Sequence, residues 1–162
     1  GQNPGQQRIA LFTEQYNSDN EVKGFDYNLF NIFTIGNNGR AGIATTKNIQ
    51  VYMLTHLCNR DQTVITVKLE RQTIVLASIY MPGNSSLPPP SDIMKELIMH
   101  CETNKLGLII CSDTNCHHIA WGSTDCNARG ESLLEYILSK NLFFKSVYNQ
   151  PVSTYHCTYI RW

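Results

Sequence analysis

Apolar runs that end abruptly in a polar residue are the dominant pattern along the chain. Residues 106–111 form an unbroken apolar run that stops at Ser112, a pattern typical of a strand covered on both faces. Residues 8–13 form a similar run that ends at Glu14, and residues 72–81 form a third. In layered α/β proteins, chemistry collects at the carboxyl ends of such strands. The pattern therefore directs attention to the residues that close each run.

The remaining segments predict further strands. Residues 62–70 alternate between apolar and polar positions, which favours an antiparallel strand with one exposed face. Residues 36–39 read Gly-Asn-Asn-Gly and predict a hairpin between strands at 27–35 and 39–46. Shorter strands are predicted at residues 49–54, 142–148 and 154–160.

Two helices are predicted in the second half of the chain. One begins at Ser91, an N-cap residue type that is followed by an acid in the first turn. The other runs from residue 130 or 131 to 140, where Asn141 is a residue type that ends helices. The residues expected to face a sheet are Ile93, Leu97, Ile98 and Cys101 in the first helix, and Leu133, Leu134, Ile137 and Leu138 in the second.

This order of elements predicts the fold class. Mostly antiparallel strands with a few helices between them indicate a layered α/β sandwich with mixed sheets and flanking helices, and not a regular doubly wound fold. The 162 residues fit one domain with a substantial core. No glycine-rich phosphate loop follows any strand, which argues against a nucleotide-driven enzyme.

Composition narrows the possible partners and compartment. Thirteen basic residues balance thirteen acidic ones and are scattered, so any nucleic acid would have to be bound locally. The longest apolar stretches fall short of the roughly 20 residues of a membrane helix, and the six cysteines form no CxxC pair. We therefore expect a soluble, intracellular protein with reduced thiols and no membrane partner. The chain lacks an initial Met and stops in a strand-like segment at Trp162, so we expect both ends to be cut.

Four residues at the ends of the apolar runs could do chemistry together. Asp113 and Asn115 lie two positions apart, so an extended backbone would direct both side chains the same way. An ionised Asp can accept a proton from water, while an Asn amide can position that water and donate to a phosphate oxygen. Glu14 would reach the same edge of the sheet as Asp113 if the strands that precede these two residues were neighbours. Tyr80 is a further polar group at a strand end. The alternative is that residues 113–115 simply form a turn.

With these residues in place, the chain resembles the endonuclease/exonuclease/phosphatase superfamily. More narrowly, it resembles the apurinic-type endonuclease domain that non-LTR (LINE-like) retrotransposons carry beside their reverse transcriptase. The resemblance extends from Arg8 to about Tyr155. The stretches that carry it are residues 9–15, 39–44, 78–82, 113–122 and 127–130, among which the long string from Asp113 to Gly130 is the most specific.

The resemblance implies a fold and an activity. The fold would be a DNase I-like sandwich, and the activity would be metal-dependent cleavage of a phosphodiester. Glu14 would hold Mg²⁺ or Mn²⁺, Asp113 would orient or deprotonate the attacking water, Asn115 would position it, and Tyr80 would contact the phosphate. In the retrotransposon setting, the implied activity is nicking of target DNA in the nucleus by a monomer whose parent chain also carries a reverse transcriptase domain.

Several family features are missing from the sequence. The family has an Asn metal ligand on a strand before the position of Arg8, and a final Asp and a Ser-Asp-His motif beyond the position of Trp162. His156 lies too early to replace the family's acid-base histidine. Losing such a group commonly lowers the rate by about 10² to 10⁴-fold, so we expect these 162 residues alone to be inactive. Within the matching stretches, Ser112, Cys116 and Gly83 replace the usual Gly, Ala and Asn.

Other interpretations remain open from the sequence. The domain could be a degenerate remnant that binds nucleic acid without cutting it, or it could act on a small phosphoester. A zinc site could form among the soft ligands, which are Cys111, Cys116, His117, His118, Cys126, His156 and Cys157, although their spacing matches no closed pattern. Arg129 could contact a phosphate or anchor its loop, and His117 could contact DNA.

Overall fold

The protein is described here by a computed structural model that places residues 5–15, 17–18, 21–147 and 155–160. Its strands are β1 (Ile9–Thr13), β2 (Asn17–Ser18), β3 (Glu21–Val22), β4 (Phe30–Thr34), β5 (Ala41–Thr46), β6 (Val51–Met53), β7 (Gln62–Lys68), β8 (Thr73–Tyr80), β9 (Gly107–Asp113), β10 (Phe143–Val147) and β11 (Tyr155–Ile160). Its helices are α1 (Asp92–Asn104) and α2 (Ala128–Ser139), with short 3₁₀ turns η1 (Thr55–Leu57) and η2 (Ile119–Trp121).

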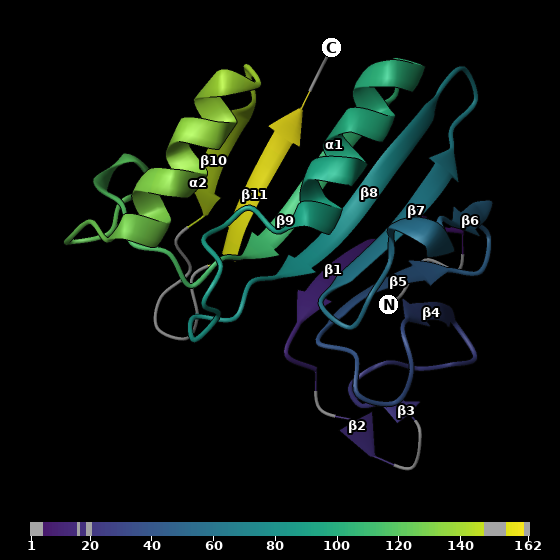
Figure 1. Ribbon diagram of the computed structural model, residues 1–162. Helices are drawn as coiled ribbons and strands as arrows, with labels where there is room; N and C mark the ends of the chain where they lie inside the picture. Colours follow the sequence, from purple (N-terminus) through teal and green to yellow (C-terminus); the bar gives the residue numbers. More distant parts are fainter. Residues whose placement is uncertain (1–4, 16, 19–20, 148–154, 161–162) are drawn as a thin grey trace.

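A six-stranded mixed sheet forms the centre of the molecule (Figure 1). Its strand order is β10-β11-β9-β8-β7-β6, and every neighbouring pair is antiparallel except β8 and β9. The exception follows from the chain path, because α1 crosses over between these two strands and returns the chain in the same direction. The carboxyl ends of β8 and β9 therefore lie side by side at one edge.

A smaller, three-stranded sheet packs against one face of the large sheet. Its order is β1-β5-β4, and all its pairs are antiparallel. The predicted turn at residues 36–39 joins β4 to β5 and confirms that hairpin. Two buried hydroxyl groups connect the sheets, since Ser78 donates to the Phe12 carbonyl at 2.7 Å and Thr63 donates to the Ala41 carbonyl at 2.9 Å.

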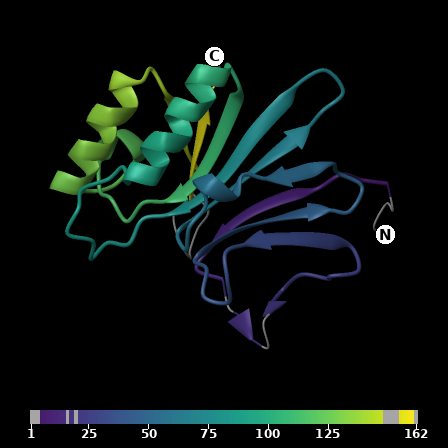
Figure 2. The same ribbon diagram turned by 45° about the vertical axis from the view of Figure 1, so that its right-hand side comes forward.

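The two helices cover the opposite face of the large sheet (Figure 2). Ser91 is the N-cap of α1 as predicted, with its side chain accepting from the Met94 amide. The face predicted for α1 is wrong at one position, because Met94 is buried in place of Ile93. In α2, Leu138 was also predicted to face inward but is 63% exposed.

Two apolar cores result, one on each face of the large sheet. The core under the helices contains Val64, Val75, Ala77, Ile79, Leu97, Ile98, Leu108, Ile110, Leu133 and Ile137 among others. The core between the sheets contains Ile43, Ile49, Ile65, Val67 and Leu76. The layered α/β sandwich predicted from the sequence is thus confirmed, with mixed sheets and helices in separate layers.

The exposure of two strands differs from the prediction. Strand β7 is buried on both faces, whereas the alternating pattern predicted one exposed face. The difference arises because β5 packs on the face that was expected to be exposed. Its polar residues are accommodated by hydrogen bonds, such as those from Gln62 Nε2 to the Leu57 and Ile93 carbonyls. Strand β9 was predicted to be covered on both faces, but residues on its second face are only half-buried.

The remaining boundaries follow the predictions closely. Asn141 follows the C-cap of α2 and has φ 52°, a left-handed conformation that ends helices. The predicted strands at 142–148 and 154–160 correspond to β10 and β11, and their outer residues 148 and 154 lie outside the described residues. Within the described residues, no helix combines the length and apolar character that crossing a membrane requires.

Candidate active site

Glu14 and Asp113 lie close together at the edge of the molecule where the two sheets approach each other. This edge, which also carries Tyr80 and Asn115, is called the rim below. Strand β1 belongs to the small sheet and β9 to the large one, so the condition considered from the sequence, neighbouring strands of one sheet, is not what brings these acids together. They come together because β1 lies against β8. Glu14 is close enough to Asp113 for its charge to raise the pKa of Asp113.

Glu14 closes β1 in an unusual backbone conformation. Its φ is 50°, in the left-handed region that a residue with a Cβ rarely adopts. The conformation is held by a hydrogen bond of 2.8 Å from the Glu14 amide to the Arg40 carbonyl. As a result, the β1 ladder ends at Thr13 and the carboxylate of Glu14 is exposed at the rim.

Tyr80 and Asp113 are paired by the register of the sheet. They are direct neighbours at the carboxyl ends of the parallel strands β8 and β9. The Met81 amide then donates to the Asp113 carbonyl at 2.8 Å, which fixes the point where both strands end. This is the position that the apolar runs predicted for both residues.

Asn115 reaches the same rim through a turn and not through extended backbone. It has φ 47°, and its Nδ2 donates to the Met81 carbonyl at 3.1 Å. Its backbone amide donates to the Asp113 carboxylate, which is the kind of local bond that Asp forms in turns. The premise of an extended strand was therefore wrong. Residues 113–115 therefore form a turn and at the same time supply two residues of the candidate site.

The electrostatics of Asp113 suit a proton acceptor. Burial raises the pKa of its half-buried carboxyl above the usual range, and the charge of Glu14 raises it further. The bond from the Asn115 amide acts in the opposite direction. A carboxylate with a raised pKa is a stronger base than an ordinary aspartate.

Tyr80 is held as a protonated hydrogen-bond donor. Burial raises the pKa of its phenol, and a hydrogen bond to Glu14 raises it further. The guanidinium of Arg40 opposes this shift, with its Cζ 4.7 Å from the centre of the Tyr80 ring. The hydroxyl of Tyr80 thus faces the carboxylate of Glu14.

Arg40 and Asp61 also belong to the rim, and sequence reasoning missed both. Arg40 donates two short hydrogen bonds to the Asp61 carboxylate, 2.6 Å from Nε and 2.7 Å from Nη2. Asp61 raises the pKa of Arg40, and Glu14 contributes in the same direction. The only available signal was two opposite charges that each precede a strand. They are 21 residues apart, and nothing in the sequence pairs them.

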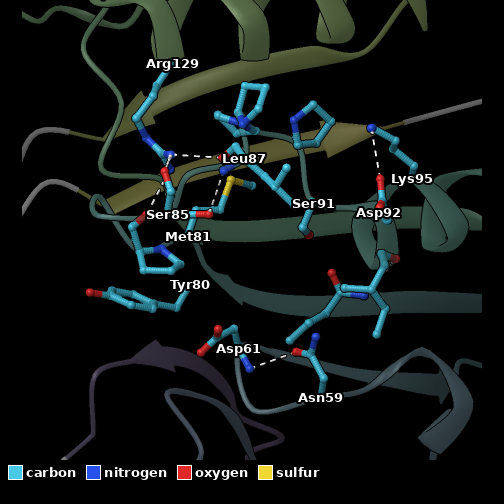
Figure 3. A pocket seen from close by; sticks show the side chains of 16 residues that line it. Asn59, Asp61, Tyr80, Met81, Ser85, Leu87, Ser91, Asp92, Lys95 and Arg129 are labelled. Carbon is cyan, nitrogen blue, oxygen red and sulfur yellow. Dashed lines mark hydrogen bonds and ion pairs between the residues drawn. The ribbon is translucent and has the colours of Figure 1, made fainter.

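Arg129 holds the loop that follows Tyr80 (Figure 3). Its guanidinium donates to the carbonyls of Pro82 at 3.0 Å and of Ser85 and Leu87 at 3.3 Å each. These bonds favour the loop-anchor interpretation, while contact of Arg129 with nucleic acid stays a prediction. Below the loop lies a cavity of about 270 Å³ that shares the walls Tyr80 and Asp61 with the rim.

His117 is exposed in the loop between β9 and α2. Its Nδ1 lies 2.9 Å from Asp125 Oδ1, so its ring is oriented by an acid and not by the rim. Its predicted contact with DNA is not tested by this geometry.

The strongest candidate for a zinc site is a group formed by His118, Cys126 and Glu131, whose ligand atoms lie within 4.8 Å of one another. His118 Nδ1 accepts from the Ala120 amide, so a neutral ring carries its proton on Nε2, which lies 3.4 Å from Glu131. The nitrogen that faces the group is thus occupied by a proton. His118 also packs on the buried Trp121, which supports a structural role for both.

The rim has a donor set that suits a hard divalent cation. It offers two carboxylates, Glu14 and Asp113, and the amide of Asn115. Mg²⁺ is commonly held by one or two carboxylates while it keeps several waters or phosphate oxygens. A cation here would also relieve the repulsion between the two acids. These residues therefore fit the metal that the sequence resemblance implied.

The fold and the paired carboxylates at its rim define a member of the endonuclease/exonuclease/phosphatase superfamily, whose enzymes typically depend on a divalent metal ion. A family model described as endonuclease-reverse transcriptase matches residues 74–159, just over half of the chain. The chain belongs to this endonuclease-reverse transcriptase family. A search of curated proteins finds no match.

Similar solved structures support the fold. The endonuclease domain of TRAS1, a telomere-specific non-LTR retrotransposon, matches with a TM-score of 0.66 and 24% identity over 93% of this chain and 71% of that one. A protein of the endonuclease/exonuclease/phosphatase family from Leptotrichia buccalis gives 0.47 and 15% over 93% and 75%. The catalytic domain of human Nocturnin gives 0.43 and 14% over 94% and 60%. The fold assignment rests on the first of these likenesses.

Proposed function

We propose that the rim is the hydrolytic half-site of a Mg²⁺-dependent DNA endonuclease that nicks target DNA for a retrotransposon-type reverse transcriptase in the same parent protein. The observation that carries the proposal is the convergence of Glu14, Tyr80, Asp113 and Asn115 from the ends of three strands onto one edge. Membership of the endonuclease-reverse transcriptase family and the likeness to a retrotransposon endonuclease domain support this choice of substrate.

Each side chain has a role that its environment favours. Asp113 accepts a proton from the attacking water, because its raised pKa makes it a better base. Asn115 positions that water, with its amide held by the Met81 carbonyl. Tyr80 stays protonated and donates a hydrogen bond from its hydroxyl to a non-bridging phosphate oxygen in place of Glu14. A Mg²⁺ ion held by Glu14 would stabilise the charge that develops on the phosphoryl oxygens.

The described rim supplies the water-activating groups but no acid for the leaving oxygen. We therefore propose that the 162 residues alone bind metal and phosphodiester without measurable nicking, and that a longer form with a further acid-base residue is active. The loss of such a group commonly lowers the rate by about 10² to 10⁴-fold.

The test is relaxation of supercoiled plasmid with Mg²⁺ by a form of the protein that includes such an acid-base residue. Asp113→Ala should abolish nicking and leave the thermal unfolding transition cooperative. Gln substitution at Glu135, an exposed acid on α2, is the matched control and should leave nicking unchanged. A wild-type protein that binds neither Mg²⁺ nor Mn²⁺ would refute the proposal. A protein that binds DNA and metal but never nicks it would instead indicate a non-catalytic remnant.

A further inference from the structure

A continuous series of hydrogen bonds runs along the rim from Glu14 to Tyr80. The Glu14 amide donates to the Arg40 carbonyl at 2.8 Å, and the Arg40 amide donates to the Arg60 carbonyl at 2.7 Å. On the other side, the Tyr80 amide donates to the Asp61 carbonyl at 2.8 Å. The ion pair between the side chains of Arg40 and Asp61 closes the series.

This series crosses from one sheet to the other. Arg40 immediately precedes β5 of the small sheet, and Asp61 immediately precedes β7 of the large sheet. Their side chains are 29% and 27% exposed, so solvent screens the pair less than it screens a fully exposed one. A guanidinium that forms two bonds to one carboxylate fixes both distance and orientation between the two sheets.

The same guanidinium also contacts the candidate site. Its Cζ lies 4.7 Å from the centre of the Tyr80 ring, and its charge interacts with both Tyr80 and Glu14. Asp61 holds the guanidinium in this place and lies in the wall beneath Tyr80 (Figure 3). One ion pair therefore lies beside both a candidate metal ligand, Glu14, and a candidate phosphate contact, Tyr80.

A second half-buried ion pair lies away from the rim. Lys140 lies 3.0 Å from Glu102 and joins the helices, with side-chain exposures of 34% and 29% that closely match those of the first pair. It touches no residue of the candidate site. This pair serves as a control for the effect of losing a half-buried ion pair elsewhere in the fold.

We propose that Arg40 and Asp61 are positioning residues that set the relative placement of Glu14 and Tyr80 across the two sheets. Neither residue reaches the reacting atoms itself. The consequence for metal binding rests on the proposed function, whereas the ordering of Glu14 does not.

The first experiment measures amide hydrogen exchange at Glu14 and Tyr80 in the 162-residue protein without metal. Arg40→Met, which keeps the aliphatic stem, should lower protection at both amides by about tenfold or more, because the bonds that close the series are lost. Arg40→Lys should not restore it, since an ammonium cannot form the two-pronged bond to Asp61. Lys140→Met should leave both amides protected as in the wild type.

The second experiment titrates the same proteins with Mn²⁺ and follows the free ion by electron paramagnetic resonance. Arg40→Met and Asp61→Asn should weaken Mn²⁺ binding about 10 to 100-fold, the usual effect of removing a residue that orients a metal ligand. Glu102→Gln and Lys140→Met should bind Mn²⁺ with wild-type affinity even where they lower the melting temperature.

The outcomes separate the two proposals. Wild-type protection of Glu14 in Arg40→Met, or equal loss of protection in Lys140→Met, overturns the positioning role whatever the metal does. Unchanged Mn²⁺ affinity in both rim variants, with the wild type binding, also overturns it. If no form binds Mn²⁺, the proposed function fails, and amide exchange alone decides the positioning role.

Discussion

The rim between the two sheets and the layer of helices differ in the residues that form them. The helical layer consists of packed apolar side chains, and the rim consists of polar groups in strained or partly buried positions. In the helical layer, apolar residues such as Leu97, Ile98 and Ile137 are buried against the large sheet. At the rim, Glu14 and Asn115 adopt left-handed backbone conformations, and burial disfavours the charge of Asp113. Strain and uncompensated charge are characteristic of functional sites, because the rest of the fold supplies the stability that they remove.

The comparison shows where stability and function separate in this fold. Changes in the helical layer should alter stability and leave the chemistry of the rim intact. Changes at the rim should affect metal binding and can even increase stability. Three substitutions test this division, beginning with the largest expected effect.

Leu97→Ala should produce the largest loss of stability. Leu97 is fully buried between α1 and the large sheet, and truncating such a residue typically destabilises a protein by about 2–5 kcal/mol. Denaturant unfolding of the metal-free protein measures the loss. Met99→Ala, on the exposed side of the same helix, should change the free energy of unfolding by less than about 0.5 kcal/mol. Equal effects from both substitutions would contradict the packing of α1.

Gly130→Ala should have an intermediate effect. Gly130 lies where α2 packs against the loop that follows β9. A Cβ at Gly130 would lie 2.0 Å from the His117 carbonyl oxygen, so the backbone itself must move. We expect destabilisation of about 1–3 kcal/mol, measured by thermal unfolding.

Gly107→Ala is the matched control for this substitution, because a Cβ there meets nothing within 4 Å. A wild-type melting temperature for Gly130→Ala would show that α2 and residues 113–118 are not packed as described.

Asp113→Asn should have the smallest effect and the opposite sign. Burial and the charge of Glu14 raise the pKa of Asp113 in the folded chain, so the folded state binds more protons than the unfolded state between the two pKa values. Stability is therefore greatest below the unfolded pKa and falls as pH rises through the folded pKa. Asparagine carries no charge and should raise the melting temperature at about pH 7.

The gain from Asp113→Asn should shrink as the pH falls toward 3.8, the ordinary value for the carboxyl. Thermal unfolding without divalent metal, repeated across this pH range, measures it. A difference between the two proteins that is independent of pH would rule out the charge of Asp113 as its cause.

Local patterns in the sequence were sufficient to predict much of the architecture. The apolar runs 8–13, 72–81 and 106–111 placed Glu14, Tyr80 and Asp113 at or next to the ends of β1, β8 and β9, because periodicity and burial are properties of short segments. The errors in the exposure of β7 and Leu138 had one source. The exposure of β7 and of Leu138 depends on which other elements pack against them. The sequence of a single strand or helix does not indicate its packing partners.

The candidate site divides in the same way. The sequence by itself determined the residue types at the strand ends and the turn at residues 113–115, since both follow from interactions between near neighbours in the chain. Only the tertiary structure decided that Glu14 faces Asp113 from a different sheet and that Arg40 pairs with Asp61. Both depend on contacts between distant segments, which form when the two sheets pack face to face and leave no local pattern in the sequence.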